Sequence, residues 1–84
     1  MTRSLHTADY AELIRILVET RKELGLTQQD VADRLEKPQS YVAKVERGER
    51  RLDVVEFIAL ARAFGVEPSA LFDRLVKALD AAQA

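Results

Sequence analysis

Hydrophobic residues recur along this chain mainly at intervals of three and four positions, and strict alternation of apolar and polar residues never lasts beyond a few positions. Intervals of three and four place side chains on one face of an α-helix, whereas alternation would indicate a half-buried strand. We therefore predict an all-α domain of five helices joined by short connections.

Capping residues, glycines and prolines divide this pattern into five segments. Thr27 and Asp53 are each followed three residues later by an acid, which is the capping-box pattern of a helix start. A glycine follows three of the apolar runs, and Pro38 suits the first turn of a helix. We expect helices at residues 7–24, 27–35, 38–47, 53–64 and 68–79, in one domain spanning 7–79, with residues 1–6 flexible and 80–84 frayed.

Length and composition exclude several classes of protein. The 84 residues fit one domain, and the absence of cysteine excludes disulfides, thiolate metal sites and cysteine nucleophiles. The single histidine, His6, forms no metal cluster by itself, and the chain has no nucleophile–base pair or glycine-rich phosphate loop. We expect no catalytic residues, no metal and no cofactor. Because no apolar run is long enough for a membrane and nothing resembles a signal peptide, we expect a cytoplasmic protein.

Charge is distributed unevenly along the chain. The net charge of −1 and the sequence pI of about 5.8 argue at first against a nucleic-acid partner. Residues 37–51, however, carry five basic and two acidic side chains, whereas the segments on either side are each acidic overall. A local basic segment is a better guide to a phosphate-facing surface than the total charge.

The predicted third helix presents a polar face. At 100° per residue, Gln39, Ser40, Ala43 and Lys44 lie within an arc of about 140°, and the two valines of the helix lie on the opposite side. Amide, hydroxyl and ammonium groups can hydrogen-bond base edges in a DNA major groove, with glutamine suited to adenine and lysine to guanine. The alternative is an ordinary solvated helix face.

Two short helices joined by a three-residue break fit a helix-turn-helix unit, here over residues 27–47. From about Leu13 to Phe72 the sequence resembles the Cro/phage-repressor-like, or XRE, helix-turn-helix family of transcriptional regulators. Three segments in this order carry the resemblance: RKELGLTQQDVA at residues 21–32, QSYVAKVERG at 39–48 and ARAFGVEP at 61–68. The resemblance implies a five-helix, repressor-like DNA-binding domain.

The resemblance also implies roles for single residues. The third helix would lie in the major groove with Gln39, Ser40 and Lys44 at the positions that usually reach bases. Gln28 matches a position that usually contacts phosphate and can brace Gln39. Tyr41 would either hydrogen-bond a phosphate or pack as a partly buried residue.

Further basic residues extend this surface. Arg47 lies on the polar arc, and Arg50 and Arg51 directly follow the helix, where phosphate contacts would add affinity that depends on salt but not on sequence. The alternative for the loop arginines is that they only keep the loop soluble. In the family, a glutamate at the place of Glu46 usually pairs with an arginine at the place of Arg21, so we expect a structural ion pair there.

One position departs from the family pattern. The family often has glycine at the turn between the two helices, and this chain has Glu36. Either Glu36 adopts a left-handed conformation, at a cost of about 1 kcal/mol, or the turn is built differently.

More apolar residues are present than one small core needs. We assign Leu24 and Phe72 to the core. Ile16 and several apolar residues of the fourth and fifth helices have no place in that core. Such a surplus suggests burial against a partner. We expect a homodimer interface at Val55, Ile58, Leu75, Val76 and Leu79. The alternative is that the fifth helix folds back over its own core.

Together these features predict a sequence-specific regulator of transcription that binds double-stranded DNA. We expect a repressor that reads a pseudo-palindromic operator as a dimer. The alternative is a protein-interaction module on the same scaffold, such as an antitoxin-like binder of another protein.

Overall fold

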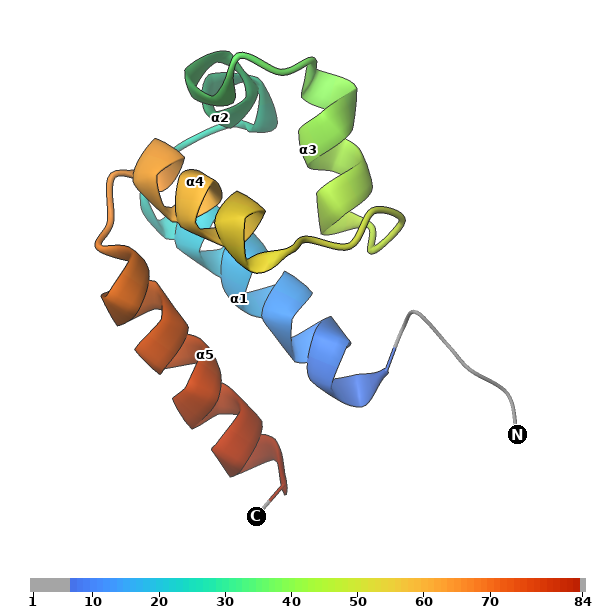
Figure 1. Cartoon of the computed structure of the whole chain (residues 1–84), viewed down its shortest axis with the longest axis vertical. Coiled ribbons are helices and arrows are strands. Elements are labelled where there is room, and N and C mark those ends of the chain that lie inside the picture. The colour runs from blue at the N-terminus through green and yellow to red at the C-terminus, as the bar shows by residue number, and fades with distance from the viewer. Residues whose placement is uncertain (1–6, 84) are drawn as a thin grey trace.

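The computed structural model describes residues 7–83, which form five α-helices and no strand (Figure 1). The all-α prediction is therefore confirmed for this part of the chain. The expectations for residues 1–6, including His6, and for Ala84 lie outside the described residues. The helices are α1 (Ala8–Glu23), α2 (Gln28–Leu35), α3 (Gln39–Glu46), α4 (Val54–Phe64) and α5 (Pro68–Gln83).

The helix starts follow the capping residues in the sequence. The Thr27 hydroxyl accepts the N–H of Asp30 at 3.0 Å, and the Asp30 carboxylate accepts the N–H of Thr27 at 2.9 Å. Asp53 and Glu56 form the same reciprocal pair at the start of α4. The sequence had suggested that Pro38 occupies the first helical position of α3. In the structure it precedes the helix as its N-cap.

α5 extends further than its predicted end. It continues to Gln83, whereas the sequence pattern placed its last residue at Leu79 and expected the residues beyond to fray. No glycine or proline follows Pro68, and Ala81 and Ala82 have the highest intrinsic helix propensity, so nothing in the sequence stops the helix.

The core lies where the five helices meet. Buried apolar side chains from every helix form one cluster: Ile16, Leu17, Val31, Ala32, Val42, Val45, Phe57, Leu60, Ala61, Ala63, Phe64 and Leu71. Ile16, which we had left outside the core, belongs to it. Leu24 and Phe72, which we had placed inside, are exposed. Leu24 is the C-cap of α1 and lies beyond the packed turns, and Phe72 lies at the edge of the α4–α5 contact, where it is 53% exposed.

α5 folds back along α1, while α3 stands on the other side of the molecule (Figure 1). Leu71, Leu75 and Ala78 of α5 pack into or against the core. Arg74 joins the two helices, because its guanidinium donates to the Thr20 hydroxyl at 2.8 Å and to both carboxylate oxygens of Glu23 at 3.0 Å. This packing leaves the outer side of α3 uncovered by α5.

The turn between α2 and α3 contains the unusual residue. Glu36 adopts the left-handed conformation, with φ 57° and ψ 44°. Among the residues that the structure describes, it is the one non-glycine residue with a positive φ. The N–H of Lys37 donates to the carbonyl of Ala32 at 2.9 Å, which closes the end of α2. The turn therefore has the backbone geometry that glycine favours, and Glu36 adopts it with some conformational strain.

None of the helices in residues 7–83 combines the length and the apolar character that crossing a membrane requires. Within the same residues, no group of three or more His, Cys, Asp or Glu side chains is arranged to hold a metal ion.

Candidate nucleic-acid interface

The outer face of α3 presents three polar side chains to solvent. Gln39, Ser40 and Lys44 are exposed, whereas Val42 and Val45 are buried in the core on the opposite side. Ala43, which the helical wheel placed among the outward residues, is buried as well. On the wheel Ala43 lies between Gln39 and Ser40, so the face keeps its width, and its exposed chemistry consists of one amide, one hydroxyl and one ammonium group.

A chain of hydrogen bonds connects this face to the interior. Gln28 donates from Nε2 to Oε1 of Glu46 at 2.8 Å, and Gln39 donates from Nε2 to Oε1 of Gln28 at 2.5 Å. Gln28 therefore braces Gln39, as the resemblance implied. Because a carboxylate only accepts hydrogen bonds, Glu46 fixes which end of each amide faces its neighbour.

The interior end of this chain is the ion pair that we expected between Arg21 and Glu46. The guanidinium donates from Nε and Nη2 to the two carboxylate oxygens, at 2.6 and 3.0 Å, and the two side chains are each only 10% exposed. Nη1 donates to the carbonyl of Leu26 at 2.8 Å. One guanidinium thus connects α1, the α1–α2 connection and the last residue of α3.

Two cations lie close to the ring of Tyr41, beside the polar face. Its ring packs against the core, and Lys37 Nζ and the Arg50 guanidinium each lie 5.2 Å from the ring centroid. Burial and the nearby Glu56 carboxylate raise the pKa of Tyr41, so its hydroxyl stays protonated at neutral pH. A shallow hollow next to the ring is lined by Lys37, Pro38, Ser40, Tyr41, Lys44 and Arg50. Three cations around one hollow favour an anion such as phosphate.

The arginines that follow α3 have partners within the protein. Arg50 forms an ion pair with Glu56, and Nε of Arg47 donates to Glu49 at 2.9 Å. The Arg51 guanidinium lies 4.1 Å from the ring centroid of Tyr10, a residue of α1. The basic segment is therefore neutralised in part by the protein itself, and the partner of Arg50, Glu56, lies outside the segment whose charges were counted.

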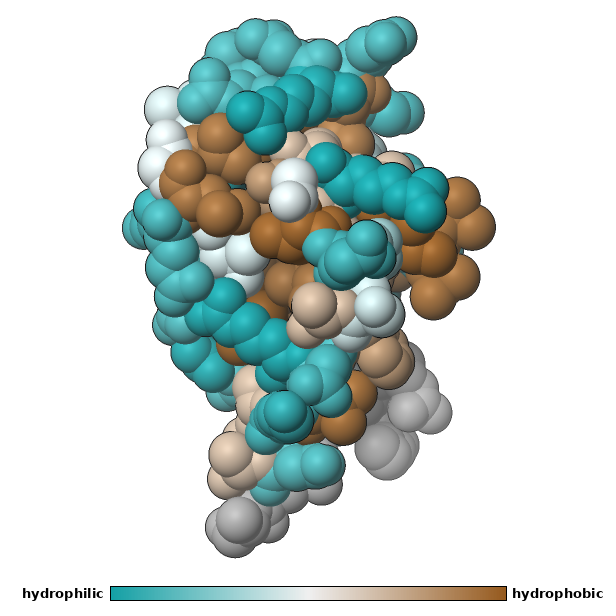
Figure 2. Space-filling view, turned by 90° about the vertical axis from the view of Figure 1, so that its left-hand side faces the viewer, coloured by the Kyte–Doolittle hydropathy of each residue, from teal (hydrophilic) through white to brown (hydrophobic). Residues whose placement is uncertain are grey.

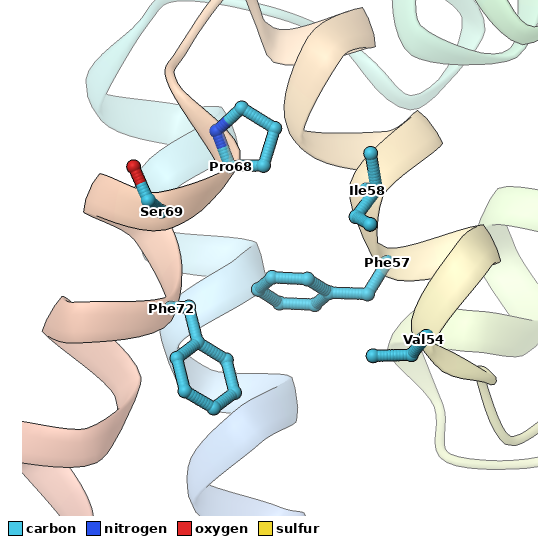
Figure 3. Close-up of a pocket in the computed structure, with 6 residues that line it drawn as sticks. All are labelled: Val54, Phe57, Ile58, Pro68, Ser69 and Phe72. Atoms are coloured by element: carbon cyan, nitrogen blue, oxygen red, sulfur yellow. The ribbon is translucent and has the colours of Figure 1, made fainter.

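A second surface, formed by α4 and α5, is apolar. Figure 2 shows brown hydrophobic surface among teal surface, gathered most clearly at the right-hand edge. Phe57 points from α4 towards α5, and the rings of Phe57 and Phe72 meet edge to face with centroids 6.2 Å apart (Figure 3). They line a hollow of about 430 Å³ whose walls are Val54, Phe57, Ile58, Pro68, Ser69 and Phe72.

The five residues expected at a dimer interface fall into two groups. Val55 and Val76 are exposed, and Ile58 and Leu79 are partly exposed. Leu75 instead packs against the core of its own chain, which corrects its assignment to the outer surface. One side of α5 therefore folds back over its own core, and another side remains uncovered and available to a partner.

The helix-turn-helix family model matches residues 17–71, which include α2, α3, α4 and the turn between them. The chain belongs to the XRE-type helix-turn-helix family. The prediction drawn from the sequence resemblance is thereby confirmed.

Individual relatives of this XRE-type domain agree with the assignment. An XRE-family-like protein from Pseudomonas syringae is 46% identical, with a TM-score of 0.78 over 83% of this chain and 85% of that one. The restriction-modification controller protein C.AhdI from Aeromonas hydrophila is 37% identical, with a TM-score of 0.69 over 77% of this chain and 98% of that one. The controller protein C.Esp1396I, solved as a tetramer in complex with its natural 35-base-pair operator, shares the fold, with a TM-score of 0.79, 22% identity and coverage of 87% and 96%.

An HTH-type transcriptional regulator of Sinorhizobium fredii, y4dJ, described as uncharacterized, is 44% identical over 46 residues. The match covers 55% of this chain and 60% of that relative, so it spans less than two thirds of the relative's length.

The sequence reasoning did not identify the contacts of three residues around α3 and the loop that follows it. Lys37 was counted as a charge but not placed beside Tyr41, Glu56 was read only as a capping residue, and Tyr10 was not singled out. The Tyr10 hydroxyl also accepts the N–H of Leu52 at 3.1 Å. The spare oxygen of a capping glutamate is a signal that could have indicated a second partner for Glu56.

Proposed function

We propose that this chain is a sequence-specific transcriptional regulator that binds double-stranded DNA and represses transcription from a pseudo-palindromic operator as a dimer. The observation that carries the proposal is the exposed face of α3, on which Gln39, Ser40 and Lys44 stand together. Membership of the XRE-type family supports it, because the second helix of a helix-turn-helix unit is the one that enters the major groove.

In the proposed complex, α3 lies in the major groove and its three polar side chains contact base edges. Gln39 is suited to adenine, since its Oε1 can accept from N6 while its second Nε2 hydrogen donates to N7. The bond to Gln28 uses the first of those hydrogens and holds the amide in this orientation. Lys44 donates to guanine, and Ser40 pairs with a neighbouring base or phosphate.

Phosphates on either side of the groove are contacted by the surrounding side chains. The residues we assign to this role are Gln28, Tyr41, Arg47, Arg50 and Arg51, to which the structure adds Lys37 as a neighbour of Tyr41. These contacts position the domain and make its affinity dependent on salt.

The dimer is proposed to form through the apolar surface of α4 and α5. Its exposed members are Val54, Val55, Phe72 and Val76, with Ile58 beside them in the wall of the hollow. A twofold axis through this surface would bring two copies of α3 to one side of DNA, about 34 Å apart for adjacent turns of the groove. The tetrameric operator complex of C.Esp1396I supports assembly of this fold on DNA.

Selection of bound duplexes from a random DNA pool tests the proposal. We expect a motif with twofold symmetry, and half-sites separated by about one helical turn. Light scattering of the protein in solution should give twice the chain mass of 9.5 kDa. Binding that appears only at low salt, with no preferred sequence, would contradict the proposal and favour the protein-interaction module.

A further inference from the structure

Glu56 connects the proposed DNA surface to the start of α4. One of its carboxylate oxygens accepts the N–H of Asp53 at 3.0 Å, and the other pairs with the guanidinium of Arg50. Arg50 in turn lies over the ring of Tyr41, on the helix proposed to enter the groove. An acid therefore holds an arginine that the proposed function assigns to a phosphate.

This pair is better organised than the neighbouring pair of Arg47 and Glu49. The capping box already fixes the Glu56 carboxylate, and the Tyr41 ring supports Arg50, so little freedom is lost when they join. Their side chains are 45% and 26% exposed, against 59% and 52% for Arg47 and Glu49. Glu56 is consequently the stronger competitor for an anion that approaches this surface.

We propose that Glu56 competes with DNA phosphate for Arg50 and thereby limits the affinity of the domain for DNA, because Arg50 must leave Glu56 before it can engage a phosphate. The inference rests on the proposed function. On a matching site, base contacts hold the backbone against Arg50, and the phosphate displaces the carboxylate. On other sequences the domain sits more loosely, and Glu56 keeps Arg50.

The consequence is a lower affinity for DNA, and the reduction is largest on the operator, where the ion pair has to be broken. Glu56 therefore also narrows the ratio between specific and non-specific affinity. An exposed ion pair of this kind changes an affinity by a few-fold, and one added phosphate contact steepens the dependence of log affinity on log salt by about 0.9.

The variant Glu56→Gln tests this competition. Glutamine retains the capping box, since its amide oxygen still accepts the N–H of Asp53, but it removes the charge that holds Arg50. Asp80→Asn on α5 is the matched control, because it removes the same charge from an exposed residue on the helix that lies away from α3 (Figure 1). Each variant is titrated with the selected operator duplex and with a scrambled duplex of equal composition, at several salt concentrations.

We expect Glu56→Gln to bind the operator about three- to tenfold more tightly, and the scrambled duplex more tightly by no more than the same factor, with a steeper salt dependence on the scrambled duplex, where Arg50 gains a phosphate contact. Asp80→Asn should change neither affinity by more than about twofold. Adding Arg50→Ala should abolish the gain, so Arg50→Ala/Glu56→Gln binds the operator no better than Arg50→Ala. Thermal unfolding checks that each variant is folded.

Two results would overturn the inference: a gain for Glu56→Gln no larger than for Asp80→Asn, or a gain that persists without Arg50. Failure of the proposed function itself is distinguishable, because the unaltered protein would then select no motif from the random pool.

Discussion

Two arginine–glutamate pairs in this molecule have the same chemistry and different surroundings. Arg21 and Glu46 are each 10% exposed and join α1 to α3, whereas Arg50 and Glu56 are 45% and 26% exposed beside the proposed DNA surface. Burial keeps the first pair away from molecules outside the protein, so it serves the fold. Exposure leaves the second pair exchangeable, so its arginine remains available to an anion from outside.

The number of hydrogen bonds reinforces this difference. Glu46 accepts three, two from Arg21 and one from Gln28, and Arg21 also donates to the carbonyl of Leu26. Removing either member of the buried pair would leave several polar atoms without partners. Removing a member of the exposed pair leaves groups that water can reach.

The largest expected effect is on the buried pair. Arg21→Ala should lower the free energy of unfolding by about 3–5 kcal/mol, because an uncompensated carboxylate remains among buried groups. Urea unfolding followed by circular dichroism measures the loss. Glu46→Ala should cost a similar amount, and the double variant less than the sum of the two. A loss below about 1 kcal/mol for Arg21→Ala would mean that the buried pair stabilises the fold no more than an exposed pair does, which would contradict the comparison above.

A smaller effect of opposite sign is expected at the turn between α2 and α3. Glu36→Gly should raise the free energy of unfolding by up to about 1 kcal/mol, since glycine adopts the left-handed conformation without strain. Glu36→Ala is the matched control, because it removes the charge but keeps a β-carbon. Equal stability of the glycine and alanine variants would show that the backbone conformation costs nothing here.

The smallest effect is expected for Arg47 and Glu49, an exposed ion pair whose members are two positions apart in the sequence. Arg47→Ala should change the free energy of unfolding by less than about 0.5 kcal/mol, since Arg47 and Glu49 are both more than half exposed. A double-mutant cycle with Glu49→Ala measures their coupling at low and high salt. A coupling above about 1 kcal/mol that survives high salt would mean that this surface is more ordered than its exposure indicates.

The sequence was sufficient for the helices and insufficient for the contacts between distant residues. The starts at Thr27 and Asp53 follow from residues three positions apart, which interact through the local backbone. Arg21 and Glu46 lie 25 residues apart, so only the family resemblance brought them together. No local rule joins Arg50 to Glu56, because the loop between α3 and α4 decides where Arg50 points.

The surface of α4 and α5 illustrates the same limit. A period of 3.6 residues identifies an apolar side of α5 but does not say how far the helix rotates about its axis when it packs on α1. Leu75 turned inward and Phe72 outward, which exchanged their expected places. The polar face of α3 was easier to predict, since two valines fixed the opposite side in the core.

The most direct test of the central claim compares the DNA motifs selected by Lys44→Ala and Lys77→Ala. Lys44 is exposed on α3, whereas Lys77 is exposed on α5 and pairs with Asp73 at 2.9 Å, so the two variants remove the same charge from different surfaces. If α3 reads base edges, Lys44→Ala loses preference at one base pair in each half-site and keeps the others, while Lys77→Ala selects the unaltered motif. An unaltered motif for Lys44→Ala would contradict the account.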